Sequence, residues 1–423
     1  MAPSSTVFSI EGRGLRFDSA ADLEPLIKPL IDSTDVYTEV RFGGNTFGVE
    51  ACELLGRVLC KQTKLHTANL ADIFTSRLLS EIPPALSCLL GALLDLHTLQ
   101  TVDLSDNAFG LNTQAPLVDF LKSHVPLRHL ILNNNGLGPK AGAGIAEALT
   151  ELCARKSKAR ADPNVKYEVP HLETIVCGRN RLESGSMAAW ARAIKDHGKG
   201  LQVVKMTQNG IRQEGITVLL DQGLRHASAL RVLDMQDNTF TKTGSKMLAD
   251  ALPGWSELRE LGVGDCFLTG RGALKVMNAL AKGENKHIQV LRLGFNDINA
   301  EGIKALLHAA KSSLPALKRV ELNGNKFDEE DPSIVELREL LEARKEEFGQ
   351  DDDDEEWGID ELDELEEESE EEEEEEESEE ETEVEKKAEK VLEAAEEEEG
   401  QKVAQRADKD VDELTAKLEA TKV

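Results

Sequence analysis

The 423-residue sequence lacks the short motifs that mark most catalytic and nucleotide-binding sites. It contains no G-x-x-x-x-G-K-[ST] phosphate-binding loop, no H-E-x-x-H metal motif, no G-x-S-x-G nucleophile motif and no kinase motif set. Aromatic residues make up only 4% of the chain, and the region before residue 350 has no basic stripe, which argues against nucleic-acid binding. These absences favour a binding protein, in which any catalysis would take place in a partner's active site.

Paired cysteines, long apolar runs and targeting signals are also missing. The six cysteines are scattered without a C-x-x-C pair or a neighbouring histidine cluster, so no metal site is expected and the pattern is typical of a reducing compartment. The longest apolar run, around residues 86–94, is too short to span a bilayer, and residues 1–18 lack a signal-peptide pattern. The sequence therefore predicts a soluble intracellular protein that does not bind membranes.

The negative charge of the chain is concentrated at one end. The whole sequence carries −31, yet residues 351–423 hold 37 acidic and 8 basic side chains, whereas residues 1–350 hold 43 acidic and 41 basic ones. We expect 349–423 to be an acidic low-complexity tail, disordered over 351–382, with a charged helix within 383–420. The simpler interpretation of this tail is a solubilising extension. The alternative is a segment that attracts basic partners by long-range electrostatics. The apolar residues near its start, which are a candidate docking or export motif, are Trp357, Ile359, Leu362 and Leu365.

Ahead of the tail, an asparagine or its substitute returns at nearly constant spacing. Residues 127–137 match L-x-x-L-x-L-x-x-N-x-L, the leucine-rich repeat signature, at every fixed position. Seven of the nine steps between successive slots are 27 to 30 residues long. The slots are Asn45, Asp72, Asn107, Asn135, Asn180, Asn209, Asn238, Cys266, Asn296 and Asn325. Because one unit cannot bury its apolar face alone, the repeats are expected to stack into a single array.

Each repeat is expected to contain a short strand, a turn and a helix. Leu130 and Leu132 alternate along one strand towards a core, and Asn135 can pair with backbone groups at the turn that follows. The prediction is an α/β leucine-rich repeat solenoid, a crescent of the ribonuclease-inhibitor type with parallel strands on the concave face and helices outside. Residues 1–30 are interpreted as an N-terminal capping segment and 31–348 as a domain of about ten repeats. The repeat at Asp72 is expected to be irregular, because aspartate is unusual in that slot.

Two of the steps are longer than the others. The step from Asn135 to Asn180 contains an insertion of about half a repeat. Its basic residues are Arg155, Lys156, Lys158, Arg160 and Lys166. A solvated loop is the simpler interpretation of this insertion, and a basic contact for an acidic partner or for the chain's own tail is the alternative. The step from Asp72 to Asn107 places Arg77 in a lengthened loop, ahead of prolines that favour a helix start.

Seven stretches are much more specific than the generic repeat pattern. They are 8–12, 72–75 followed by Arg77, 104–110, 134–139, 177–183, 236–241 and 321–325, and the acidic tail follows them. Through these stretches the chain resembles the Ran GTPase-activating proteins of the short fungal type over residues 7–330. The extra folded C-terminal domain of animal members is not recognisable. Ser76 and the pair Leu78-Leu79 stand where relatives are expected to carry a glycine and a basic residue.

This resemblance implies an activator of the small GTPase Ran in its GTP form. GTPases of the Ras type orient the attacking water with a glutamine. The resemblance implies that an asparagine on the edge of the repeats holds that glutamine in its productive pose, and that GTP and Mg²⁺ are held by the GTPase, so the activator needs no cofactor of its own. By motif position the asparagine is Asn134, and the family's important arginine is Arg77. Further implied contacts with the GTPase are Asp106, Arg179, Arg181, Gln208 and Asp237.

The resemblance also implies a cellular setting, and it leaves two alternatives open. Ran-binding accessory proteins and transport receptors are further expected partners, and a monomer is expected because one asymmetric surface serves one GTPase. The expected location is the cytoplasm, including the nuclear periphery, in support of nucleocytoplasmic transport. The first alternative is a non-catalytic leucine-rich repeat scaffold. The second is an acidic histone-chaperone-like binding protein, which the spacing disfavours because such proteins have repeats of about 22–25 residues.

Overall fold

The computed structural model describes residues 6–33, 36–349 and 357–366. Its strands are β1 (Val7–Ser9), β2 (Arg16–Phe17), β3 (Glu39–Arg41), β4 (Thr46–Phe47), β5 (Thr67–Asn69), β6 (Thr101–Asp103), β7 (His129–Ile131), β8 (Thr174–Val176), β9 (Val203–Lys205), β10 (Val232–Asp234), β11 (Glu260–Gly262), β12 (Val290–Arg292), β13 (Arg319–Glu321) and β14 (Gly358–Ile359). Its α-helices are α1 (Ala20–Leu23), α2 (Lys28–Asp32), α3 (Val49–Leu59), α4 (Ile82–Leu93), α5 (Gly110–Thr113), α6 (Ala115–Ser123), α7 (Gly138–Ala161), α8 (Met187–His197), α9 (Gln213–Val218), α10 (Thr241–Ala251), α11 (Thr269–Leu280), α12 (Ala300–Ser312) and α13 (Pro332–Phe348). Short helical turns are η1 (Ser184–Ser186), η2 (Leu219–Gly223), η3 (Leu224–His226) and η4 (Leu252–Gly254).

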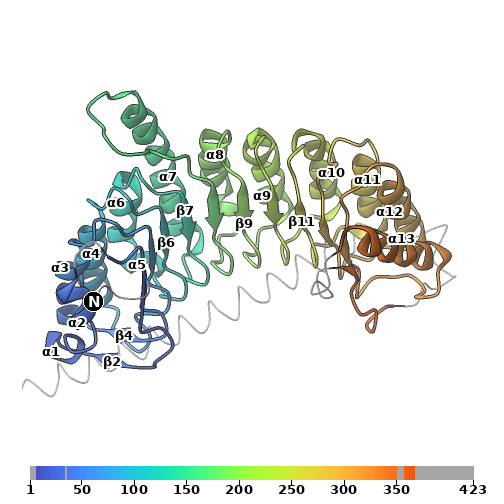
Figure 1. Cartoon of the computed structure of the whole chain (residues 1–423). Coiled ribbons are helices and arrows are strands. Elements are labelled where there is room, and N and C mark those ends of the chain that lie inside the picture. The colour runs from blue at the N-terminus through green and yellow to red at the C-terminus, as the bar shows by residue number, and fades with distance from the viewer. Residues whose placement is uncertain (1–5, 34–35, 350–356, 367–423) are drawn as a thin grey trace, which may run out of the picture. The chain divides into compact units, whose positions relative to one another are not determined.

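The strands follow one another across a single parallel sheet. Its order is β1-β3-β5-β6-β7-β8-β9-β10-β11-β12-β13-β14, and β2 and β4 form a separate parallel pair. Within the described repeats, the strands line the inner side of the curve and the helices its outer side (Figure 1). The middle residue of each repeat strand, such as Leu130 or Ile175, is buried against the helices. The predicted α/β leucine-rich repeat solenoid is confirmed.

A buried ladder of asparagines joins the repeats at the turn after each strand. Asn180 shows the pattern, since its Nδ2 donates to the carbonyl oxygens of Leu132 at 2.7 Å and Gly178 at 2.9 Å, while its N–H donates to Oδ1 of Asn209 at 2.9 Å. The amide therefore pairs backbone groups of neighbouring repeats that would otherwise be buried without partners. Cys266 fills one slot with a thiol, and its backbone N–H still donates to Asn296 Oδ1 at 3.0 Å.

The structure corrects one slot of this ladder. The ladder residue lies six positions after the first residue of its strand, and after β5 that position is Ile73, not Asp72. The N–H of Ile73 donates to Asn107 Oδ1 at 2.9 Å, which is the ladder bond. Asp72 lies one position earlier, with a φ of 48°. The repeat is irregular as expected, because a buried isoleucine stands where its neighbours carry an amide.

Residues 6–33 do more than cap the array. β1 pairs in parallel with β3, so the N-terminal segment supplies the first strand of the main sheet. Phe17 of β2 packs on Phe47 of β4 with ring centroids 5.0 Å apart, and both rings are buried. Helix α2 crosses the predicted boundary at residue 30, which makes the segment continuous with the first repeat.

The expectation of disorder over 351–382, and with it the tail boundary at 349, is wrong for residues 357–366. β14 pairs with β13, and the carboxylate of Asp360 accepts hydrogen bonds from Leu322 N at 2.6 Å and Asn323 N at 3.2 Å. Ile359 and two following leucines pack against the core. These residues belong to the candidate docking or export motif named above, and they cover an otherwise unpaired sheet edge. The charged helix expected within 383–420 lies outside the described residues.

The long insertion is mainly an extension of α7, which spans Gly138–Ala161. Lys156 lies buried on this helix, and its Nζ donates to the carbonyl oxygens of Val125 at 2.7 Å, Leu127 at 2.6 Å and Pro170 at 2.8 Å. The solvated-loop interpretation is therefore wrong for Lys156, although Lys158 on the same helix is exposed. Within the described ranges, no helix is both long and apolar enough to cross a membrane.

Candidate functional site

One row of side chains follows the edge of the sheet where the strands end. Each member, here called a rim residue, directly precedes a ladder position and has a left-handed φ between 48° and 61°. The rim residues are Asp72, Asp106, Asn134, Arg179, Gln208, Asp237, Asp265 and Phe295. Their backbone N–H groups bond to the next repeat, as Asn134 N does to Gly178 O at 2.9 Å. The backbone is thus satisfied and fixed, and all of these side chains except the half-buried Asp72 are exposed.

Asn134 holds its side chain in a defined orientation on this rim. Its Nδ2 donates to Oδ1 of Asp106 in the preceding repeat, at 2.8 Å. Because an ionised carboxylate only accepts hydrogen bonds, this contact determines which end of the amide is nitrogen. Asn134 Oδ1 is therefore the end turned away from Asp106, and asparagine also tolerates the left-handed backbone better than most residues do. The result is an exposed, preoriented hydrogen-bond acceptor.

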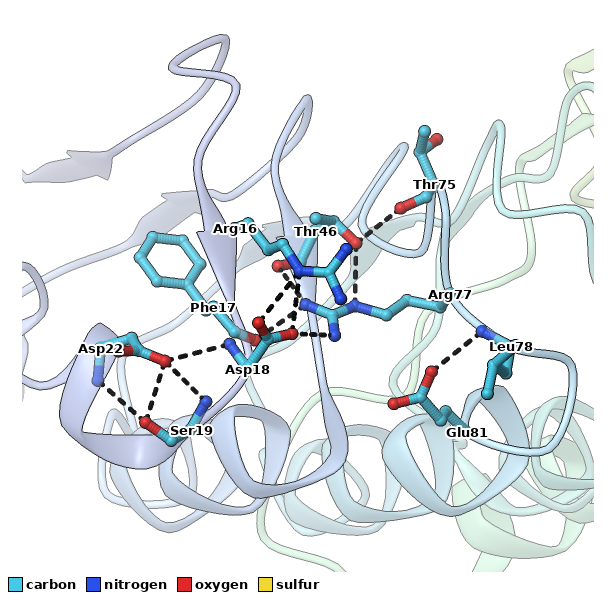
Figure 2. A network of polar contacts seen from close by, with 10 residues as sticks. All are labelled: Arg16, Phe17, Asp18, Ser19, Asp22, Thr46, Thr75, Arg77, Leu78 and Glu81. Carbon is cyan, nitrogen blue, oxygen red and sulfur yellow. Dashed lines mark hydrogen bonds and ion pairs between the residues drawn. The ribbon is translucent and has the colours of Figure 1, made fainter.

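Arg77 lies elsewhere and points into the protein. Figure 2 shows its guanidinium between the N-terminal segment and the loop before α4. Its Nε donates to Thr46 Oγ1 at 3.0 Å, and its Nη2 donates to the carbonyl oxygens of Phe17 at 3.0 Å and Thr46 at 3.1 Å. Its Nη1 forms an ion pair with Asp18. The side chain is only 2% exposed, so it does not project from the surface as an arginine finger would.

The surroundings of Arg77 tie three segments together. Thr46 Oγ1 also donates to Thr75 O at 2.7 Å, which joins β4 to the loop that carries Arg77. Hydrogen bonds from Arg16 and then from Arg77 lower the pKa of Asp18, so that carboxylate stays ionised in this cluster. Figure 2 shows Arg16 and Arg77 converging on Asp18. Among the described residues the polar contacts of the Arg77 side chain go to this cluster and not to Asn134, which follows β7, two strands along the sheet from β5.

The structure gathers three of the predicted contact residues around one hollow of about 500 Å³ on the strand side. Arg179, Gln208 and Asp237 line it, and Arg179 Nε donates to Gln208 Oε1 at 2.8 Å. Arg181 is exposed with a φ of 53°, but it follows the ladder residue and does not line this hollow. Asp106 lies further along the rim, where it pairs with Asn134.

Sequence reasoning missed two further members of the rim, Asp265 and Phe295. Both line the same hollow, and the signal for them was the position before Cys266 and Asn296. Burial and the nearby charge of Asp237 raise the pKa of Asp265. The hollow is thus strongly acidic, with an exposed aromatic ring at its edge.

Potential metal ligands do not gather in the part of the chain that the structure describes. No group of three or more histidine, cysteine, aspartate or glutamate side chains there could hold a metal ion. All six cysteines are free thiols, and burial raises the pKa of Cys177 to about 12, so this thiol remains protonated. The candidate site therefore consists of oriented polar groups on a rigid edge, which can position part of another molecule.

Comparisons with known proteins agree with this description. A family model described as "Leucine Rich repeat" matches residues 284–307. The chain is 39% identical to Ran GTPase-activating protein 1 of Saccharomyces cerevisiae, a match that covers 80% of this chain and 82% of the relative. It is 34% identical to the Ran GTPase-activating protein of Drosophila melanogaster over 76% of this chain and 52% of that relative. It is 38% identical to Ran GTPase-activating protein 1 of Xenopus laevis over 48% of this chain and 34% of that relative.

The yeast match decides the family, because it covers most of both chains at 39% identity. The chain extends over about half of the Drosophila relative and a third of the Xenopus one, so those relatives contain regions with no counterpart in the matches. Together, the repeat fold, the rim and these identities show that the chain belongs to the Ran GTPase-activating protein family.

Proposed function

We propose that this protein stimulates GTP hydrolysis by the small GTPase Ran, with Asn134 as the residue that acts on the GTPase's active site. The observation that carries the proposal is the fixed Asn134 amide, which Asp106 orients at 2.8 Å on an exposed and rigid rim. Membership of the family supplies the partner, since its curated members are named for activating the GTPase of Ran.

The chemistry needs little more than orientation. Hydrolysis of GTP requires a water molecule held in line with the γ-phosphate, and in Ras-type GTPases a glutamine holds it. A free glutamine side chain samples several rotamers, so most of its conformations are unproductive. Asn134 Oδ1 can accept a hydrogen bond from the NH₂ group of that glutamine. The glutamine's own carbonyl oxygen is then directed away from Asn134, where it can accept a hydrogen bond from the attacking water and so hold it in line.

Asp106 and the backbone contribute by keeping Asn134 still. Asp106 occupies an N–H of the asparagine amide, so the amide cannot flip without losing a hydrogen bond to a charged acceptor. The N–H of Asn134 is bonded to Gly178 O, which holds the turn against the next repeat. Because this order exists before the partner binds, little entropy is lost when the glutamine is captured.

Arg77 is proposed to be a positioning residue. Its guanidinium is occupied by Phe17, Asp18 and Thr46, so it acts by holding the loop before α4 and not by approaching the nucleotide. Asp106, Arg179, Gln208 and Asp237 are proposed contacts along the same rim. Arg181, which follows the ladder residue Asn180, is a further proposed contact.

The cellular setting follows from the proposed activity. GTP and Mg²⁺ would be held by the GTPase, and one activator molecule would serve one GTPase, as a monomer. We place the protein in the cytoplasm, including the nuclear periphery, because a gradient of Ran·GTP across the nuclear envelope requires hydrolysis outside the nucleus. Accessory Ran-binding proteins and transport receptors are proposed further partners, and the acidic tail is the segment that would attract basic ones.

Single-turnover hydrolysis of GTP preloaded on Ran tests the proposal. Catalytic amounts of the wild-type protein should accelerate hydrolysis strongly, and Asn134→Gly should lose about 100-fold of that rate, as is usual when one orienting polar group is removed. Glycine is the sharper substitution, because it removes the side chain without straining the left-handed backbone. Asn164→Ala, which removes an exposed asparagine away from the rim, is the matched control and should retain full activity.

Two outcomes would contradict the proposal in different ways. If intact wild-type protein bound Ran·GTP without changing its hydrolysis, the non-catalytic scaffold would be the better description. If the wild type accelerated hydrolysis and Asn134→Gly did so equally, the protein would be an activator that works through another residue.

A further inference from the structure

The loop between β5 and α4 exposes two adjacent leucines. Leu78 is 69% exposed and Leu79 is 63% exposed, although leucine is normally buried. Leu111, in the equivalent region of the next repeat, is 50% exposed. These three account for a large share of the exposed large apolar side chains in the described ranges. Exposed apolar side chains on the loops of two neighbouring repeats are candidates for an interaction site.

The two leucines are held firmly in this exposed position. Leu78 N donates to Glu81 Oε2 at 2.9 Å (Figure 2). Glu81 N donates back to Leu78 O at 2.9 Å. On the other side, Arg77 N donates to Phe74 O at 3.0 Å, and Phe74 is buried. The Arg77 guanidinium then fixes this end of the loop to β2 and β4. The leucines therefore cannot fold back into the core without breaking several hydrogen bonds.

This apolar loop is continuous with the rim that carries Asn134. Phe74, at the start of the loop, and Phe109, just before Leu111, contact each other with ring centroids 6.4 Å apart. Gly110 N donates to Asn135 O at 3.0 Å, which ties the Leu111 turn to the residue beside Asn134. The loops follow β5, β6 and β7, which are neighbours in the sheet and so are spaced about 5 Å apart.

We propose that Leu78, Leu79 and Leu111 form an apolar docking surface for the GTP-bound GTPase, beside Asn134. This inference rests on the proposed function. The occupant is an apolar patch on the GTPase segment next to its catalytic glutamine, because only that segment must lie within reach of Asn134 and of its neighbouring loops. Such switch segments are ordered by the γ-phosphate and released after hydrolysis, so docking on them favours the GTP form.

The inference also gives Arg77 a function that fits its inward orientation. By fixing the loop, Arg77 keeps Leu78 and Leu79 exposed and preorganised, which lowers the entropic cost of binding. The charge of Arg77 is paired with Asp18, so the docking surface itself presents no unpaired cation from this residue. Docking through these leucines should therefore depend on apolar area and only weakly on salt, unlike contacts made by charged side chains.

A concentration series of the single-turnover assay separates docking from orientation. Leu78→Ser combined with Leu79→Ser should raise the activator concentration at half-maximal rate about tenfold, because two partly exposed leucines lose their burial in the complex. The maximal rate should stay the same, since Asn134 is untouched. Leu78→Met combined with Leu79→Met should behave like the wild type, because methionine keeps the apolar area. Val335→Ser, an exposed apolar residue on α13, is the matched control.

The outcomes distinguish this inference from the function on which it rests. A tenfold shift at unchanged maximal rate, with the same factor at low and high salt and with a wild-type melting temperature, supports the docking surface. An unchanged half-maximal concentration in the serine variant, with a fully active wild type, overturns the inference and leaves the activator function intact. Absence of acceleration by the wild type overturns both. Concentration-dependent dimers that the serine substitutions abolish would overturn the inference by assigning the surface to a second copy.

Discussion

Substitution of Arg77 by alanine should weaken the N-terminal end of the array before it affects any chemistry. The side chain is 2% exposed and makes three hydrogen bonds to neutral oxygens of Phe17 and Thr46. At about 1 kcal/mol each, these bonds contribute roughly 3 kcal/mol. Phe17 O keeps a second donor, Gly48 N at 2.7 Å, and Asp18 is 57% exposed, so its ion pair adds little. The expected loss is therefore about 2 kcal/mol.

Hydrogen exchange measured by mass spectrometry is the suitable assay, because repeat arrays need not unfold in a single step. Arg77→Ala should speed exchange about 30-fold in the peptides that contain residues 16–18, 46–48 and 74–78, since about 2 kcal/mol corresponds to that factor. Peptides from α10 and α11 should be unaffected. Arg179→Ala, which loses one exposed hydrogen bond to Gln208, is the matched control and should leave exchange near wild type. Loss of GTPase activation by Arg77→Ala without faster exchange in these peptides would refute the inward, positioning role.

Three further perturbations test other parts of the structure. Lys156→Met should lower the free energy of unfolding by about 3 kcal/mol, because three carbonyl groups lose a buried donor. Lys158→Met, at an exposed position on the same helix, should change it little, and urea denaturation measures both variants. Burial lowers the pKa of His197 to about 4, so the unfolded state binds the proton more tightly, and stability should fall as pH drops from about 6.5 towards 4. In His197→Gln, the free energy of unfolding should therefore fall less between pH 7 and pH 4.5 than in the wild type, as denaturation curves at the two pH values would show. A chain ending at residue 349 should melt several degrees below one ending at residue 366, since only the longer chain keeps the strand pairing and the Asp360 hydrogen bonds; equal melting temperatures would show that this segment does not stabilise the repeats.

The repeat fold was accessible from sequence because its signal is periodic. As their spacing predicts, Leu130 and Leu132 are buried in the core, and the buried Asn135 pairs with backbone groups at the turn. Asp72 was wrongly assigned to the ladder because aspartate is polar like asparagine. The residue that occupies the ladder position, Ile73, is apolar and looks like a core residue in the sequence. The packing of the C-terminal segment was missed although its apolar residues were recognised, because the acidic residues around them indicated a disordered tail. Composition describes an average, and packing depends on where individual side chains fall.

Contacts between distant positions could not be read from the sequence. Arg77 reaches Asp18 across 59 residues and Thr46 across 31, and Lys156 meets carbonyl groups that carry no sequence signature of their own. The resemblance suggested a partner contact for Arg77, and the sequence suggested solvent or a partner for Lys156, but the fold buried both side chains. The orientation of Asn134 likewise depends on Asp106, 28 residues earlier, which the repeat spacing brings alongside it. The position of the candidate site was therefore predictable, but the direction of its side chains was not.

The most direct test of the central claim is a double-mutant cycle between Asn134 and the catalytic glutamine of the GTPase. Single-turnover hydrolysis would be measured for Ran with and without that glutamine, each with the wild-type activator and with Asn134→Gly. If Asn134 acts by orienting the glutamine, Asn134→Gly should cost about 100-fold with intact Ran and almost nothing with Ran that lacks the glutamine. An equal cost in both backgrounds would mean that Asn134 works independently of the glutamine, and the proposed mechanism would be wrong.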